Sequence, residues 1–347
     1  MLRRVVLPSV LGILCALAVA DRIAAQSLIF AGDFESGGFA GWSAVVPPVM
    51  TWDWNPADGT LAMFRKGQLV AVYERDTAPG RSIANAITQL YAVDGPGVNL
   101  LSDSSPLVPP QILVGVGDDL IPDPCSNDPG ADSCDYFVHH APEVTILPSN
   151  GGSVELEVVA TATQHFDQAT PIAYGSDMTI SVPYHALHTI VDYQVETILA
   201  QSVNARHAVR PFPFYELVAQ PYTTVDYLDA NCTDVQAVAI PMSGPNQVFL
   251  QQSPVCADRP WAALYPNASG NLGMILESWV WSTGSPELLS YTEPVAHPGR
   301  PNLYFQSDDH SRRYDTGSWT GRLVFLAYTN AEDSTPVADY RDWLGAP

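Results

Sequence analysis

Basic residues are scarce in this chain. It has 15 Lys plus Arg against 37 Asp plus Glu over 347 residues, a formal net charge of -22, and Lys66 is its single lysine. A nucleic-acid backbone is bound through clustered basic side chains, so this deficit argues against a nucleic-acid partner. Anionic membrane surfaces are poor partners for the same reason.

Long apolar runs are missing after the first residues. No later segment reaches the about 18 unbroken apolar residues of a membrane span, so the sequence predicts none. At the start, Arg3 and Arg4 precede the mostly apolar run 5–20, and small residues end near Ala25. This pattern predicts a signal peptide over residues 1–25, with cleavage after Ala20 as the alternative, and a secreted, periplasmic or cell-surface protein.

Familiar catalytic motifs are also absent. The sequence has no G-x-S-x-G, no H-E-x-x-H, no G-x-x-x-x-G-K-[ST] and no C-x-x-C. A Ser–His–Asp triad assembles in space and leaves no such trace, so it stays open. A glycosidase needs two carboxylates at a set separation, but in so acidic a chain the sequence alone selects no pair.

Four cysteines remain once Cys15 leaves with the signal peptide: Cys125, Cys134, Cys232 and Cys256. An even number in an exported chain predicts two disulfides. Three pairings are possible, and the pairing of neighbours, 125 with 134 and 232 with 256, closes the shortest loops. Each bridge would contribute about 2–4 kcal/mol. The spacings fit no zinc pattern.

Short strands separated by Gly and Pro dominate the rest of the chain, which has 24 Gly and 30 Pro. The pattern predicts an all-β fold, an antiparallel β-sandwich (jelly-roll-like) with few short helices, over residues 26–330 as one large or two packed sandwiches. A tail, 331–347, carries one short helix over 336–344 that ends at Gly345. The clearest strands are 68–73, 111–116, 143–147, 154–160, 178–182, 235–240, 276–281 and 322–328.

Two of these strands form a predicted hairpin, and a further segment is ambiguous. Residues 143–147 and 154–160 flank Asn150-Gly151, and Glu155 and Glu157 should point away from the face of Val154. Residues 187–199 fit either a helix face or a strand in which apolar residues alternate with polar ones. We favour the strand because Thr, Ile, Val and Tyr crowd this segment.

An acidic loop surrounds the first two cysteines. Calcium takes six to eight hard oxygen ligands, and a disulfide-closed loop could supply them. The spacing does not match an EF-hand, and the alternative is a solvated loop built from turn-forming residues. The candidate calcium ligands here are Asp118, Asp119, Asp123, Asp128 and Asp132.

Two tryptophan pairs could offer flat aromatic platforms. Residues two apart on a strand share a face, which applies to Trp52 with Trp54 and to Trp279 with Trp281. We expect the second pair in the core because its neighbours are apolar. Trp52 and Trp54 have polar neighbours, so they are the candidate ligand-binding residues. His185 and His188 would share a face only on a helix, and no third ligand makes them a metal site.

Residues 30–43 read Phe-Ala-Gly-Asp-Phe-Glu-Ser-Gly-Gly-Phe-Ala-Gly-Trp-Ser. This segment resembles the "GDFESG…GW" opening of many secreted bacterial β-sandwich domains, some of which are carbohydrate-binding modules of the galactose-binding-like jelly-roll class. The resemblance covers about fourteen residues. It implies a β-sandwich, and in the sugar-binding members it implies a structural calcium near Glu35, with Asp33 beside it. Fold likeness does not transfer function by itself.

These features lead to one functional hypothesis and one alternative from another class. The hypothesis is an exported non-enzymatic β-sandwich protein that binds carbohydrate or a cell-envelope partner and is stabilised by calcium. The alternative is a secreted hydrolase or lyase that acts on polysaccharide or ester substrates. A third interpretation is a purely structural surface protein without a cleft.

Overall fold

The structure is a computed structural model of the chain. It describes residues 49–75, 86–101, 107–108, 111–114, 134–138, 143–147, 151–164, 171–199, 203–205, 209–215, 218–240, 246–251, 255–281, 286–292, 299–307, 312–314, 317–329 and 333–346. The predicted signal peptide and the opening segment 30–43 lie outside these residues.

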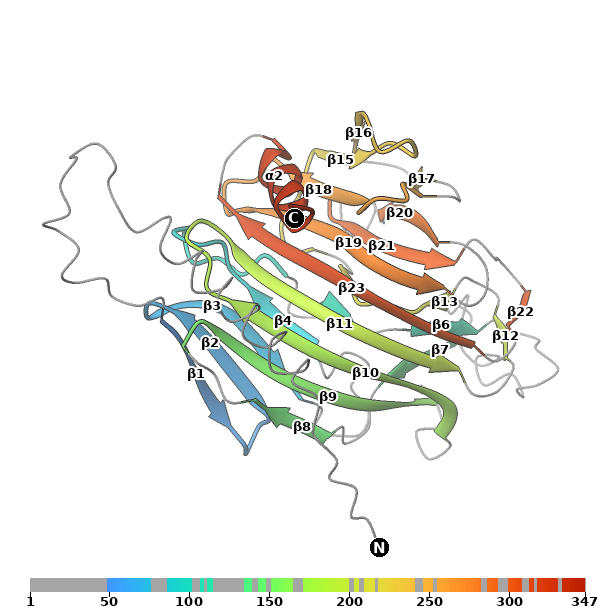
Figure 1. The fold of residues 1–347 in the computed structure, drawn as a ribbon, viewed down its shortest axis with the longest axis horizontal. Coiled ribbons are helices and arrows are strands. Elements are labelled where there is room, and N and C mark those ends of the chain that lie inside the picture. Colours follow the sequence, from blue (N-terminus) through green and yellow to red (C-terminus); the bar gives the residue numbers. More distant parts are fainter. Residues whose placement is uncertain are drawn as a thin grey trace, which may run out of the picture.

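Two large antiparallel sheets make up most of the described part of the chain. The smaller sheet has nine strands (Figure 1). In spatial order these are β1 (Met50–Asn55), β2 (Thr60–Arg65), β3 (Gln68–Glu74), β4 (Ala86–Leu90), β5 (Leu107–Val108), β14 (Phe214–Tyr215), β21 (Pro301–Ser307), β20 (Pro286–Thr292) and β17 (Asn246–Gln251).

The larger sheet has twelve strands, and its centre consists of five long ones that run side by side. In spatial order they are β13 (Val209–Arg210), β6 (Gln111–Val114), β7 (Cys134–Val138), β9 (Ser153–Gln164), β10 (Pro171–Pro183), β11 (Thr189–Leu199), β23 (Gly317–Tyr328), β19 (Asn271–Trp281), β18 (Trp261–Tyr265), β15 (Thr224–Leu228) and β16 (Val235–Ala239), with β8 (Glu143–Ile146) pairing to β9. A small ribbon joins β12 (Val203–Ala205) to β22 (Arg312–Tyr314).

The predicted all-β antiparallel fold is confirmed. The ambiguous segment forms strand β11, in which buried and less buried residues alternate, as favoured above. The predicted hairpin forms as β8 and β9, with Glu143 opposite Val159 and Gly151 at a φ of 84°. The tail forms α2 (Thr335–Leu344), which ends at Gly345.

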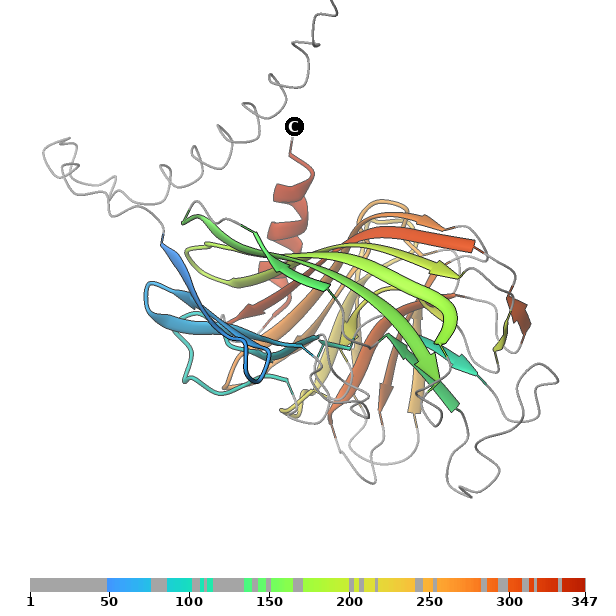
Figure 2. The ribbon, with the colours of Figure 1, turned by 90° about the horizontal axis from the view of Figure 1, so that it is seen from below.

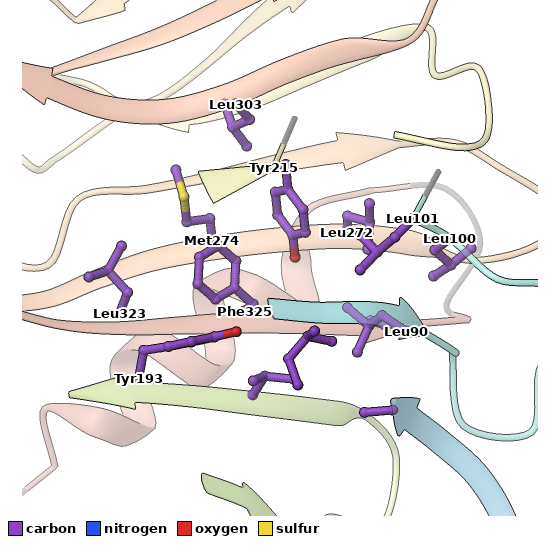
Figure 3. Close-up of a cluster of buried hydrophobic side chains, with 14 of the residues drawn as sticks. Leu90, Leu100, Leu101, Tyr193, Tyr215, Leu272, Met274, Leu303, Leu323 and Phe325 are labelled. Atoms are coloured by element: carbon purple, nitrogen blue, oxygen red, sulfur yellow. The ribbon is translucent and has the colours of Figure 1, made fainter. Parts of the chain in front are cut away.

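The main core lies between the two sheets, and Figure 3 shows a part of it. Phe325 of β23 makes T-shaped ring contacts with Tyr193 from the same sheet and with Tyr215 from the opposite sheet, with ring centroids 5.6 and 5.1 Å apart. The Tyr215 hydroxyl donates a hydrogen bond of 2.9 Å to the carbonyl of Gly273 on β19. Edge-to-face pairs add about 0.5–1.5 kcal/mol each beyond burial. This cluster therefore joins the layers.

Helix α2 lies against the other face of the larger sheet, away from the smaller sheet (Figure 2). We call this face, which carries Glu157, Gln194 and Arg322, the outer face. A second apolar cluster fills the space under α2 and includes Ile275, Val324 and Val337. The protein thus has a third, partial layer that covers one half of the outer face.

Candidate functional site

Two neighbouring strands mark where the helix-covered half of the outer face ends. On β23, all residues from Leu323 to Tyr328 are buried, whereas Ser318, Thr320 and Arg322 are not. On β19, residues 271–276 are all buried and exposure begins at Glu277. A strand covered on both faces reads as continuously apolar, and a strand with one wet face alternates. The open half of the outer face therefore begins at Arg322.

Three contacts hold α2 in place. At Gly273, a Cβ atom would overlap Cγ2 of Val337, so the helix approaches the sheet where β19 has no side chain. At the start of the helix, the Ser334 hydroxyl donates to Oδ2 of Asp226 at 2.7 Å. At its other end, Arg341 donates to the carbonyls of Asp258 and Arg259. These contacts fix the position of α2 beside the open half of the outer face.

The open half contains a depression of about 750 Å³ that crosses β9, β10, β11, β23 and β19. This volume lies within the about 300–1,000 Å³ of small-molecule sites. We call it the outer groove. Its lining is described below as two parallel rows of residues, which lie side by side on the outer face and run across the five strands. The order of these strands can be followed in Figure 1.

The first row is the one nearer to α2. Its members, in strand order, are Glu157, Thr179, Gln194, Arg322 and Ser278. The second row is one step farther from the helix. Its members, in the same order, are Val159, Asp177, Glu196, Thr320 and Val280. The first row combines one carboxylate, two hydroxyls, one amide and one guanidinium. The second row combines two carboxylates and one hydroxyl, with exposed valines at its two ends.

Three carboxylates of the groove lie on adjacent strands. Asp177 on β10 is directly opposite Glu196 on β11, and Glu157 on β9 is diagonal to Asp177. Opposed side chains in an antiparallel pair have Cβ atoms about 4.5–5.5 Å apart, and like charges there destabilise the sheet. All three side chains are exposed. The groove therefore concentrates negative charge at some cost in stability.

Arg322 is the one basic residue among the described residues that line the groove. Its guanidinium donates to both carboxylate oxygens of Asp192, with Nη2–Oδ2 at 2.6 Å, and Nη1 lies 3.8 Å from Glu277. The hydrogen bond to Asp192 raises the pKa of Arg322. Because two acids share this cation, it does not neutralise the other carboxylates of the groove.

A β-bulge explains how β19 supplies two polar residues at this point. The register shifts between Leu276 and Ser278, so Glu277 is the extra residue of the bulge. Ser278 is paired with Arg322, and the Glu277 carboxylate also lies near the Arg322 guanidinium. Bulges re-aim side chains in this way. The shift also allows Leu276 and Trp279 to pack toward the main core although they are three residues apart. The expectation that Trp279 packs in the core is confirmed in part, because it is partly buried there.

The border between groove and helix carries aromatic and imidazole rings. Burial raises the pKa of the Tyr340 hydroxyl on α2, and the nearby Asp192 carboxylate raises it further. The His185 ring stacks on His188 at 4.9 Å and meets the Tyr340 ring at 5.9 Å. Burial, His188 and Arg65 lower the pKa of His185 to about 4, and burial lowers that of His188. Both rings are therefore neutral at pH 7.

The β10–β11 turn, which carries these histidines, is held by side chains from a distance. Nδ1 of His185 accepts hydrogen bonds from the backbone N–H groups of Leu187 and His188 at 3.3 and 3.1 Å. Arg65 of β2 donates to the carbonyls of His185 and Ala186 at 2.7 and 2.5 Å. Because Nδ1 is occupied as an acceptor inside the turn, His185 serves the turn itself.

The predicted tryptophan platform lies on the other sheet. Trp52 and Trp54 sit on edge strand β1, opposite the buried Met63 and Leu61. Trp52 is 43 % exposed. Trp54 is half-buried against the core, and the Arg75 guanidinium lies 5.7 Å from its ring centroid. The two indoles thus share the core-facing side of the edge strand and are not part of the outer groove.

The remaining predicted site residues fall largely outside the described residues. This holds for Glu35, Asp118, Asp119, Asp123, Asp128, Asp132 and Cys125, while for Cys134 only the strand position in β7 is described. The predicted Cys232–Cys256 disulfide is confirmed, with Cα atoms 5.2 Å apart. Within the described ranges, no group of three or more His, Cys, Asp or Glu side chains is placed to hold a metal ion. No helix among them is long and apolar enough to cross a membrane.

Sequence reasoning missed the outer groove, although part of its signal was visible. The alternation of Glu155 and Glu157, and of Gln194 and Glu196, predicted that these side chains point away from the core. Nothing in the sequence indicated that β9, β10, β11, β23 and β19 are neighbours in this order. The position of Arg322 in the groove depends on the pairing of β23 with β11, and its partner Asp192 lies 130 residues earlier in the chain.

Comparisons with known proteins give distant likenesses only. No family model and no curated protein matches the chain. Among solved structures, the Slr1438 protein from Synechocystis sp. PCC 6803 shares 12 % identity at a TM-score of 0.36, over 82 % of this chain and 96 % of that one. The alpha-N-acetylgalactosaminidase NagBb from Bifidobacterium bifidum shares 12 % at 0.39, over 85 % of this chain and 38 % of its own. The GH36 alpha-galactosidase AgaB from Geobacillus stearothermophilus shares 12 % at 0.35, over 81 % and 41 %.

Proposed function

We propose that this chain is an exported β-sandwich protein that binds carbohydrate in the outer groove. The observation that carries the proposal is the groove itself: an open depression across five strands, lined by carboxylates, hydroxyls and an amide. Sugar hydroxyls both donate and accept hydrogen bonds, so a lining such as Glu157, Thr179 and Gln194 suits them. Val159 and Val280 offer apolar surface to the C–H face of a sugar ring.

Two features of the sequence support export and a saccharide ligand. Residues 1–25 have the pattern of a signal peptide. The segment 30–43 resembles the opening of secreted sandwich domains, some of which bind carbohydrate. The Cys232–Cys256 disulfide fits an oxidising compartment. Calcium bound by Glu35 or by the acidic loop 118–132 stays part of the proposal as a stabilising ion, which a thermal melt with and without a chelator would test.

The test is a glycan array followed by calorimetric titration of the best saccharide. Gln194→Ala removes an amide from the middle of the groove without changing charge, and Gln236→Ala makes the same change on the exposed edge strand β16. We expect Gln194→Ala to weaken binding by about fivefold or more, since one hydrogen bond is worth about 1 kcal/mol, and Gln236→Ala to leave it unchanged. The proposal fails if no glycan binds, or if both variants behave alike.

A second candidate function is hydrolysis or elimination on a polysaccharide, and one observation favours it. Asp177 and Glu196 face each other directly across two strands. Retaining glycosidases use two carboxyl groups about 5–5.5 Å apart, one as nucleophile and one as acid and base. If the groove were catalytic, Asp177→Asn and Glu196→Gln would each abolish release of new reducing ends or unsaturated products. Binding without any product, for all polysaccharides that bind, would exclude it.

A further inference from the structure

We propose that the outer groove selects saccharides that carry protonated amines, namely amino-sugar units with a free amine, over neutral and anionic sugars. This inference rests on the proposed function and adds the class of ligand. Glu157, Asp177 and Glu196 supply three exposed carboxylates on adjacent strands. Within the described lining, the charge of Arg322 is already shared between Asp192 and Glu277. The groove therefore presents an uncompensated negative field.

The repulsion between the acids destabilises the sheet when no cation is bound, and a bound cation would replace this repulsion by attraction. Asp177 and Glu196 lie opposite each other, where like charges destabilise a strand pair. A cation placed between two such carboxylates interacts with both, and at a few ångströms each interaction outweighs the screening by physiological salt. A protonated amine would thus be attracted by the same charges that repel a uronate.

The position of the groove on the sheet favours a saccharide over a basic peptide. The acids lie on a sheet face, and β9, β10, β11 and β23 are each paired on both sides where they line the groove. The backbone groups of these four strands are used within the sheet, so an extended peptide finds no free edge to pair with beside the acids. An amino sugar needs only side-chain partners, and hydroxyls from Thr179, Ser278 and Thr320 stand beside the acids.

The experiment compares three oligosaccharides of equal length by calorimetric titration: a glucosamine oligomer, its N-acetylated form and a galacturonic-acid oligomer. All three titrations use the same buffer at the same pH. We expect the free-amine oligomer to bind about tenfold more tightly than the N-acetylated one and to lose affinity as salt is raised. The galacturonate should bind least.

Matched charge-neutralising variants locate the effect. Asp177→Asn and Glu196→Gln should each reduce the preference for the free amine about fivefold or more, and each should leave the melting temperature unchanged or higher because one like-charge contact is removed. Asp53→Asn, on exposed β1 of the smaller sheet, changes net charge equally and should leave the preference intact. Circular dichroism checks that each variant is folded.

The outcomes separate this inference from the proposed function. Equal affinity for the free-amine and N-acetylated oligomers overturns the amine selectivity and leaves carbohydrate binding standing. Loss of the preference in Asp53→Asn as well would assign it to the overall charge and also overturn the inference. If no saccharide binds, the proposed function and the inference fall together, and binding of a lysine-rich peptide alone would identify the groove as a peptide site.

Discussion

Arg322 and Asp192 form a two-pronged ion pair across β23 and β11, with Nε–Oδ1 at 3.0 Å and Nη2–Oδ2 at 2.6 Å. The two residues are diagonal neighbours, because Arg322 is opposite Gln194 and Asp192 is opposite Val324. The pair stands where the apolar cluster under α2 ends and the outer groove begins. The pair gives the guanidinium and the carboxylate hydrogen-bond partners at the edge of the apolar cluster.

Removing one partner of this pair should destabilise the protein. We expect Asp192→Asn to cost about 1–2 kcal/mol of unfolding free energy, because a charge-assisted hydrogen bond is lost while Arg322 stays half-buried. Urea unfolding at pH 7 measures the change. Asp177→Asn serves as the matched control on the same face and should be neutral or stabilising. Equal destabilisation by both variants would contradict the special role of Asp192.

The seat of α2 on Gly273 gives a second prediction. An alanine there places its Cβ against Val337, so Gly273→Ala should cost about 1–3 kcal/mol by overpacking or displace the helix. Urea unfolding measures the loss of stability, and the rate of trypsin cleavage at Arg341 measures displacement of the helix. The double variant Gly273→Ala/Val337→Ala should lose less than the two single costs added together, because the overlap is gone. Simple additivity would show that the two residues do not meet.

The stacked histidines predict how stability depends on pH. The pKa of His185 is lowered from 6.5 to about 4, and that of His188 is lowered as well. For His185, the unfolded chain therefore binds more protons than the native state between about pH 6.5 and 4, so stability falls as pH drops through this window, by at most about 1.4 kcal/mol per pH unit. His188 contributes in the same direction.

A comparison of variants isolates the histidine contribution to that slope. His185→Gln cannot take up a proton, so its melting temperature should fall less steeply with pH than that of the wild type. Leu187→Gln changes an exposed residue of the same turn and should keep the wild-type slope. The groups that face the pair are Arg65 from β2, Tyr328 from β23, and Asp339 and Tyr340 from α2. Parallel curves for His185→Gln and wild type would contradict the prediction.

The Cys232–Cys256 disulfide predicts a coupled loss of stability at the end of α2. It links residues 24 apart, for which loop closure is worth about 3 kcal/mol. The N–H of Asp258 also contacts the Cys232 sulfur, and Asp258 in turn binds Arg341. The double variant Cys232→Ala/Cys256→Ala should therefore unfold at lower urea and be cut faster by trypsin at Arg341.

The other two cysteines provide the comparison for this experiment. Cys125→Ala/Cys134→Ala should cost about as much if the second predicted disulfide forms, and little if both thiols are free. A wild-type urea midpoint for the Cys232→Ala/Cys256→Ala variant would contradict the stabilising role of the confirmed bridge.

Local patterns in the sequence were sufficient for the individual elements. Alternation in 189–199 and the β-branched residues there predicted a strand, and the run before Gly345 predicted the helix, because both signals depend only on neighbours in the chain. The apolar run within 322–328 predicted a strand. It did not show that α2 covers the outer face of this strand.

Composition and local pattern alone thus determined the acidic character, the all-β class and the individual strands, whereas the choice among the three cysteine pairings came from the structure. Only the tertiary structure decided which strands are neighbours, and with that the outer groove. Glu157, Asp177, Glu196 and Arg322 come from four strands whose order in the sheet is set by long-range pairing. Long-range pairing depends on how two whole faces pack, and no window of sequence contains that energy.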